Sequence, residues 1–309
     1  MQAAARKIPM LLLDATLHAG SQRNRWPARR LYARLYQQLS TISAVTEADA
    51  TRFRQIVPEH AGIVVDGDTR FDQVAQRRRM AARVDLPHWI KRSDRPFTFL
   101  AGSSWGPDEA ILVPAWQQFR RSLPEPSTAR MILVPHEPTA THLAPLEAQF
   151  RSCGLSWVRM SQLATAEPQG TSQAVASQEN DADVLLVDRV GVLAEMYAHA
   201  DCAYIGGAFT TGVHNVMEPA IAGLPLWFGP RHHNAPEAGH LLENGVAAVV
   251  RSPAELTEQL QTLWSQPQVR EQKGALACSY VESNLGASQR CTQRIVAVLP
   301  PPVRTEEHS

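Results

Sequence analysis

The segment Gly206–Ala220, GGAFTTGVHNVMEPA, combines residue types that can hold an anion and a sugar. Its two glycines follow the apolar run Cys202–Ile205 and permit a sharp turn, and Asn215 can cap a following helix. The first N–H groups of such a helix, and the positive end of its dipole, favour a phosphate. A carboxylate repels phosphate, so we expect Glu218 to accept hydrogen bonds from hydroxyls such as those of a ribose. His214, four residues before Glu218, can share a helical face with it.

The same segment allows a plainer interpretation, in which its residues serve only the backbone. The Gly-Gly pair can merely make a turn, and an acid such as Glu218 is favourable in the first turn of any helix. A metal site is another alternative, because His232 and His233 lie in the same half of the chain. Their spacing from His214 and Glu218 fits no compact ligand set, so we expect no metal.

Two earlier loops also carry side chains suited to a sugar or a phosphate. The segment AGSSWGPDEA supplies the hydroxyls of Ser103 and Ser104, although Ser104 or Asp108 can equally be a plain helix cap. In ILVPHEP, His136 follows Pro135 and could contact a base or a phosphate. A lone loop histidine is more often only solvated.

A fourth loop, GPRHHNAPEAGHLLENG, places Asn234 and Glu237 near a helix start, where both could contact a ligand. Other nucleotide motifs are missing from the sequence. It has no G-x-x-x-x-G-K-[ST] phosphate loop, no G-x-G-x-x-G dinucleotide fingerprint and no G-x-S-x-G elbow.

From residue 97 onward, short apolar runs alternate with segments of helical spacing, the pattern of βα units around a parallel sheet. Runs that are almost wholly apolar are typical of strands covered by helices on both faces. The pattern predicts a doubly wound, Rossmann-like α/β domain whose ligands bind beyond the carboxyl ends of the strands. The predicted strands are 97–101, 131–134, 156–160, 184–187, 202–205, 226–228 and 246–250. The predicted helices are 108–121, 143–152, 192–198, 216–222 and 253–265.

The first 95 residues show the same alternation in a shorter form. Predicted strands at 8–13, 42–45 and 63–66 enclose helices at 28–39 and 47–56, which together make a poor independent core. We interpret this region as an appendage or as the closing part of a second Rossmann-like domain. The predicted organisation is a partial N-terminal domain (1–80), a linker (81–96), a complete domain (97–298) with a mobile loop at 166–182, and a tail (299–309). Residues 73–96, rich in arginine and aspartate, are interpreted as the connection between the two domains.

Composition and charge set further bounds. The chain has 309 residues, 44% hydrophobic and 19% charged, which is typical of a globular protein. Its net charge of zero conceals an asymmetry, because residues 1–95 carry 17 Lys and Arg against 9 Asp and Glu. A basic front, rich in arginine between residues 23 and 34, could meet anionic lipid, nucleic acid or a phosphorylated substrate. It could also be an ordinary solvated helix face.

Several segments, taken in their order along the chain, resemble motifs of the 3-deoxy-D-manno-octulosonic acid (Kdo) transferases, which are glycosyltransferases of the GT-B fold. The resemblance covers nearly all of residues 97–298, and the front also fits through PMLLLDATL, AVTEADATRF and DGDTRFD. The combination of Gly-Gly, H-N-x-x-E-P and G-L-P-x-x-x-G-P is its most specific part. The segments are AGSSWGPDE, ILVPHEP, VLLVDRVGVLAEMYAHADCAYIGGAF, GVHNVMEPAIAGLPLWFGP and NAPEAGHLLENG.

The resemblance implies transfer of Kdo from CMP-Kdo to a lipid A precursor in lipopolysaccharide biosynthesis, with inversion, no cofactor and no metal. It implies a peripheral protein at the cytoplasmic face of the inner membrane, with basic residues 23–34 toward the anionic surface and no nucleic acid as partner. Gly206, Gly207, His214, Asn215 and Glu218 would hold the CMP phosphate and ribose. The rest of the donor site would be lined by Ser103, Ser104, Pro135, His136, Asn234 and Glu237.

The sequence departs from the family at two places. Family members are longer at the front, and that part holds the glutamate expected as general base, so no catalytic residue is assigned here. Without it we expect this chain to bind CMP but to lose about 10²- to 10⁴-fold in transfer. The second departure is Trp105 with Gly106, where many relatives carry His and Glu. The alternatives are a non-catalytic nucleotide-sugar-binding remnant and a UDP-sugar transferase or epimerase of the same fold.

Overall fold

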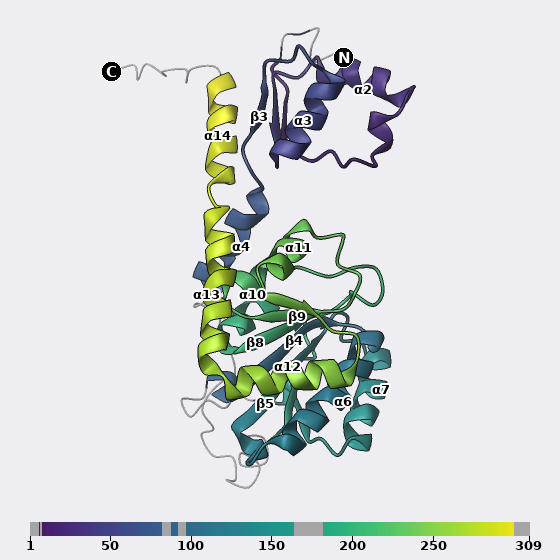
Figure 1. Cartoon of the computed structure of the whole chain (residues 1–309), viewed down its shortest axis with the longest axis vertical. Helices are drawn as coiled ribbons and strands as arrows, with labels where there is room; N and C mark the ends of the chain where they lie inside the picture. The colour runs from purple at the N-terminus through teal and green to yellow at the C-terminus, as the bar shows by residue number, and fades with distance from the viewer. Residues whose placement is uncertain (1–5, 7, 82–87, 92–96, 164–181, 300–309) are drawn as a thin grey trace, which may run out of the picture. The chain divides into compact units, whose positions relative to one another are not determined.

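The computed structural model describes residues 6, 8–81, 88–91, 97–163 and 182–299 (Figure 1). Residue contacts divide the chain into two compact units, which we describe separately. Unit 1 comprises residues 1–73 and 283–309, and unit 2 comprises residues 74–282. Most of the loop predicted at 166–182 and of the tail predicted at 299–309 lies outside the described residues.

Unit 2 is built on a seven-stranded parallel sheet with the order β10-β9-β8-β4-β5-β7-β6. All seven strands predicted in this part of the chain are confirmed, and the three central ones are almost entirely buried. The α/β class and the Rossmann-like architecture are therefore confirmed as well. The strands are β4 (Phe97–Ser104), β5 (Ala129–Pro135), β6 (Trp157–Arg159), β7 (Val184–Leu186), β8 (Cys202–Ile205), β9 (Leu226–Phe228) and β10 (Ala247–Val249).

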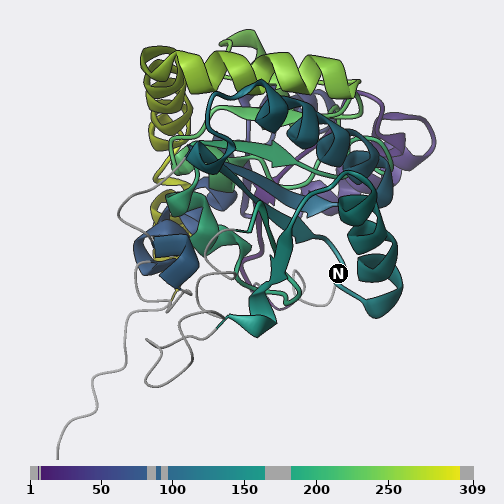
Figure 2. The same ribbon diagram turned by 90° about the horizontal axis from the view of Figure 1, so that it is seen from below.

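Helices cover both faces of this sheet (Figures 1 and 2). The helices α6, α7 and α12 pack on one face, where Trp116, Phe119 and Leu260 join strand residues such as Phe99 in one buried cluster. Figure 1 shows α10 and α11 on the opposite face. The α-helices of unit 2 are α5 (His88–Lys91), α6 (Gly106–Ser122), α7 (Ala140–Ser152), α9 (Leu193–Met196), α10 (Met217–Ile221), α11 (Pro236–Glu243), α12 (Pro253–Ser265) and α13 (Pro267–Ser283). Short 3-10 turns are η2 (Pro126–Thr128), η3 (Met160–Gln162) and η4 (Tyr197–His199).

Unit 1 contains a three-stranded parallel sheet with the order β1-β2-β3. Its small core forms around Ile42, Ala50 and Phe53, which are fully buried. The C-terminal helix α14 joins this unit, where Arg290 donates to the backbone oxygen of Asp66 over 2.8 Å. The elements are β1 (Leu11–Ala15), η1 (Gln22–Asn24), α2 (Ala28–Tyr36), β2 (Thr41–Ala44), α3 (Glu47–Ile56), β3 (Ile63–Val65), α14 (Ala287–Val298) and the beginning of α4 (Thr69–Ala81).

The structure differs from the expected organisation between residues 69 and 96. Two helices, α4 and α5, occupy part of the region that the sequence suggested was only a connection. The apolar side of α4 is narrow, and three consecutive exposed arginines at 77–79 hide its helical periodicity. Contacts also group residues 283–298 with unit 1, whereas the sequence placed them in the larger domain. The roles given to the two domains remain predictions.

Candidate functional site

The candidate site lies where the central strands of unit 2 end. The chain runs from β4 to β5, then to the edge strand β6 and back to β7, which lies between β5 and β6, before it crosses to β8 on the other side of β4. Such a switch point leaves a crevice at the carboxyl ends of the two neighbouring strands, which is where doubly wound sheets bind ligands. The structure places six of the predicted residues at the ends of β4, β5 and β8. They are Ser103, Ser104, Pro135, His136, Gly206 and Gly207.

The Gly206-Gly207 turn brings the end of β8 against the end of β4. The N–H of Gly206 donates to the carbonyl of Gly102 over 2.9 Å, and a Cβ at position 206 would lie 2.1 Å from the oxygen of Ser103. Gly207 has a φ of +91°, a region that only glycine adopts without strain. A Cβ there would meet the His214 ring at 2.7 Å. The turn therefore requires glycine at both positions.

The carboxylate of Asp108 ties this turn to the loop after β4. It is fully buried and accepts hydrogen bonds from the N–H groups of Trp105 and Gly207, both over 3.0 Å, and from the hydroxyl of Tyr204 over 2.8 Å. Asp108 therefore does more than the plain cap that the sequence offered as an alternative. The N–H of Gly207 is bonded to Asp108, and the N–H of Gly206 is bonded to Gly102 of β4. The two glycines therefore shape the turn but offer no free N–H group to a ligand.

An indole and three imidazoles gather beside the turn. The Trp105 ring lies 4.8 Å from that of His136 and 6.4 Å from that of His142, and His136 stacks on His214 with centroids 4.4 Å apart. The indole N–H of Trp105 donates to Nε2 of His214 over 3.1 Å. Since an indole nitrogen only donates, Nε2 of His214 must be unprotonated. Burial lowers the pKa of His214, and the neighbouring His136 lowers it further.

Behind this group, Glu109 joins α6 to the start of α7. Its buried carboxylate accepts from the hydroxyl of Ser104 over 2.8 Å and lies 2.9 Å from Nε2 of His142. Burial raises the pKa of Glu109, while Ser104 and His142 oppose the rise. The hydroxyl of Ser104 is thus engaged inside the fold, whereas that of Ser103, the preceding residue, belongs to a partly exposed side chain.

The two asparagines predicted for the site serve the backbone of the loop around His214. Asn234 accepts from the N–H of Val213 over 3.1 Å and donates to the carbonyl of the same residue over 2.9 Å. Asn215 accepts from the N–H of Met217, the first residue of α10, over 2.9 Å, although Val216 and not Asn215 occupies the N-cap position of that helix. Glu237 lies buried in the first turn of α11.

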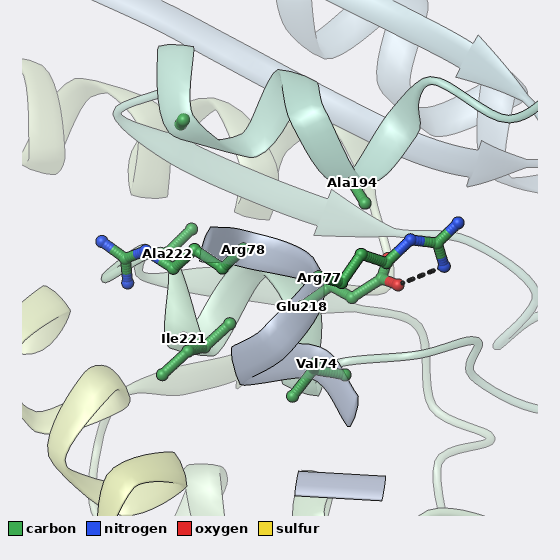
Figure 3. Close-up of a pocket in the computed structure, with 8 residues that line it drawn as sticks. Val74, Arg77, Arg78, Ala194, Glu218, Ile221 and Ala222 are labelled. Atoms are coloured by element: carbon green, nitrogen blue, oxygen red, sulfur yellow. Dashed lines mark hydrogen bonds and ion pairs between the residues drawn. The ribbon is translucent and has the colours of Figure 1, made fainter. Parts of the chain in front are cut away.

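Glu218 lies in α10 and faces another helix. Its carboxylate pairs with Arg77 of α4 over 3.1 Å, beside a small cavity that is partly open to solvent (Figure 3). Burial raises the pKa of Glu218, and the Arg77 guanidinium opposes the rise. The expectation that His214 and Glu218 share a helical face is wrong, because α10 begins only at Met217. Backbone hydrogen bonds fold His214 back over Gly206 before the helix starts.

The structure adds four residues that the sequence did not single out for this site. Trp105 donates to His214, Asp108 holds the glycine turn, His142 pairs with Glu109 and Arg77 pairs with Glu218. The sequence did carry a signal for Asp108, because Asp108 and Glu109 lie at a strand-to-helix junction. Acids that are buried at such a junction need hydrogen-bond donors from neighbouring loops. Nothing in the sequence linked Arg77 to Glu218, which lie 141 residues apart.

Comparison with known proteins gives relatives in one family. Residues 1–73 match the family model described as 3-deoxy-D-manno-octulosonic-acid transferase (kdotransferase). The enzyme of that name from Bordetella pertussis is 28% identical over 93% of this chain, and that from Haemophilus influenzae is 24% identical over 92%. The chain spans 63% of the length of each of these relatives.

Solved structures support the same fold. The C-terminal CMP-Kdo binding domain of WaaA from Acinetobacter baumannii covers 68% of this chain, and the chain covers 96% of that domain, with a TM-score of 0.50 at 20% identity. UDP-GlcNAc 2-epimerase from Neisseria meningitidis matches 96% of the chain and 71% of its own length, with a TM-score of 0.59 at 16% identity. The fold is thus GT-B-like, and the resemblance to the Kdo transferase family is confirmed over most of the chain.

Proposed function

We propose that unit 2 binds CMP-Kdo and that the protein serves the transfer of Kdo to a lipid A precursor in lipopolysaccharide biosynthesis. The observation that supports this most directly is the convergence of the ends of β4, β5 and β8 at the topological switch point. The loops there carry the residues that the family motifs implied. Relatives named as Kdo transferases support the same substrate class.

Within this proposal one side of the site donates hydrogen bonds and the other side carries a carboxylate. His214 is held with Nε2 as acceptor, so its proton lies on Nδ1, which can donate to a phosphate oxygen. His136 and Ser103, a partly exposed residue, lie at neighbouring strand ends and can add donors. Glu218 offers a carboxylate to the ribose hydroxyls. The nucleotide would lie with its phosphate at the histidines and its ribose toward α10.

Titration calorimetry with CMP and UDP tests the donor assignment. We expect CMP to bind and UDP to bind at least about tenfold more weakly, a difference of about 1.4 kcal/mol. Equal or tighter binding of UDP would instead favour a UDP-sugar transferase or epimerase, whose fold the similarity to UDP-GlcNAc 2-epimerase would explain. Binding of CMP without transfer by this chain would fit the non-catalytic alternative. The absence of a metal requirement remains a prediction, tested by repeating the titration with EDTA.

We also propose that the basic segment 23–34 docks on an anionic membrane surface. Beside its arginines, the side chains of Trp26, Leu31 and Leu35 are exposed, by 74%, 60% and 42%. A helix with apolar and cationic side chains exposed together suits a lipid interface. No helix among the described residues is long and apolar enough to cross a membrane. Co-sedimentation with anionic vesicles should therefore fall in a Trp26→Ser, Leu31→Ser double variant and be weak with neutral vesicles.

A further inference from the structure

The cavity beside Glu218 is formed by three helical segments of unit 2. Figure 3 shows the side chains of Arg77 and Glu218 close together beside it, joined at their ends by their ion pair. Most of the other lining side chains are small or apolar. The lining residues are Val74, Arg77 and Arg78 from α4, Ala194 and Ala198 from the α9 region, and Glu218, Ile221 and Ala222 from α10 and its end.

The exposure of the two partners bears on what the ion pair does. The Arg77 side chain is 53% exposed, whereas that of Glu218 is only 14% exposed. A pair with one half-exposed partner adds little to folding stability, because solvent screens it and ordering the long side chain costs entropy. The pair therefore has more influence on the charge state and orientation of Glu218 than on the stability of the fold.

Several charged or titratable groups face Glu218. Arg77 bonds it, and the negative charge of Glu195 in α9 opposes its ionisation. The buried hydroxyl of Tyr197 lies within its electrostatic reach. Arg78 also lines the cavity, but its guanidinium is directed to the sulfur of Cys278, 3.8 Å away. Arg77 is thus the cation placed to balance the acid.

This balance matters for a hydroxyl-binding carboxylate. Only the ionised form offers all its lone pairs as acceptors, whereas a protonated acid becomes a donor itself. Arg77 contacts Oε1, which leaves Oε2 for a ligand. An uncompensated carboxylate would also repel a donor that carries a phosphate.

We propose that Arg77 is a positioning residue of the donor site, which holds the Glu218 carboxylate ionised and oriented to accept the ribose hydroxyls. The inference rests on the proposed function, because it assumes that a ribose occupies this place. It assigns α4, a helix that the sequence suggested was a connection, to the nucleotide site. Arg77 acts through Glu218 and makes no contact with the phosphate.

The test is a set of calorimetric titrations of the full chain with cytidine and with CMP, at several pH values. In Arg77→Ala we expect the affinity for both ligands to fall about tenfold at pH 7, as for loss of a charge-assisted hydrogen-bond partner. The affinity should also be lost at a higher pH on acidification than in the wild type, because the pKa of Glu218 rises without its cation. Arg79→Ala, an exposed arginine on the same helix outside the cavity lining, is the matched control and should change neither value more than about twofold.

A Glu218→Gln background separates the possible roles of Arg77. There, Arg77→Ala should cause no further loss and no pH shift. Three results would overturn the inference and leave donor binding intact. The first is that Arg77→Ala binds both ligands as tightly as the wild type, or more tightly, with the same pH profile. The others are that Arg77→Ala weakens the binding of CMP but not of cytidine, or that it weakens binding equally in the Glu218→Gln background. Wild-type protein that binds neither ligand would overturn the proposed function itself, and this inference with it.

Discussion

The first strands of the two units share a backbone irregularity but use it differently. In unit 1, Asp14 has a φ of +51° where the register between β1 and β2 shifts. In unit 2, Ser103 has a φ of +55° where the register between β4 and β5 shifts. Both are non-glycine residues in the left-handed region, which is uncommon and often marks a functional site.

The surroundings of the two residues decide their roles. Asp14 accepts from the N–H of Thr69 over 3.0 Å and from its hydroxyl, so it caps the start of α4. In the described residues β1 pairs with β2 alone, whereas β4 has a partner on each side. Ser103 therefore lies between converging strand ends and Asp14 does not. The comparison teaches that backbone strain becomes a candidate site only where the sheet topology brings several strand ends together.

The largest effect is expected from a substitution that blocks the close contact between the end of β8 and the end of β4. Gly206→Ala would place a methyl group 2.1 Å from the backbone oxygen of Ser103, where no flexible side chain can yield. We expect a loss of about 3 kcal/mol in the free energy of unfolding, with loss of CMP binding. Urea denaturation and calorimetry measure the two effects. Gly106→Ala is the control, because a Cβ there meets nothing within 4 Å; equal stability of the two variants would contradict the close approach.

The next largest effect is expected from substitution of the two aspartates that cap helices, Asp108 and Asp14. Asp108→Asn replaces one of two acceptor oxygens by an NH₂ group that faces N–H and O–H donors. We expect a loss of about 2 kcal/mol in stability and weaker CMP binding, because the glycine turn loses its anchor. Asp14→Asn should cost about 1 kcal/mol and leave CMP affinity unchanged, because Asp14 bonds Thr69 in the first turn of α4, about two turns before Arg77. A comparable fall in affinity for both variants would show that the two caps do not differ in function.

A smaller effect concerns protonation near the end of β4. NMR titration should give His214 a pKa below its ordinary value of 6.5, and His136→Ala should move that value upward because a neighbouring charge is removed. Since the folded state disfavours the protonated ring, the stability that His214 contributes is present above the unfolded pKa. It is lost as the pH falls through the lower folded-state pKa. An unchanged His214 pKa in His136→Ala would show that the stacked rings are not electrostatically coupled.

The sequence predicted the strands of unit 2 well because each is a short apolar run with clear borders. Helix α4 was missed because Arg77, Arg78 and Arg79 interrupt its apolar face, and its significance depends on a partner far along the chain. Motif order located the candidate residues near the strand ends. It did not separate ligand-facing groups from supporting ones, since the bonds from Asn234 to Val213 and from Asp108 to Gly207 depend on folded loops.

The smallest effect is expected from substitution by glycine at Ser103 and Asp14, the two residues with a positive φ. These substitutions test the comparison of the two units most directly. Ser103→Gly removes a strained side chain, so the free energy of unfolding should rise by about 0.5 kcal/mol. If its hydroxyl contacts the donor, CMP affinity should fall in the same variant. Asp14→Gly removes equal strain but also the cap on Thr69, so its stability should fall by about 1 kcal/mol. The same substitution is thus expected to act with opposite signs, and equal signs would mean that local strain, and not the surrounding topology, determines what these residues do.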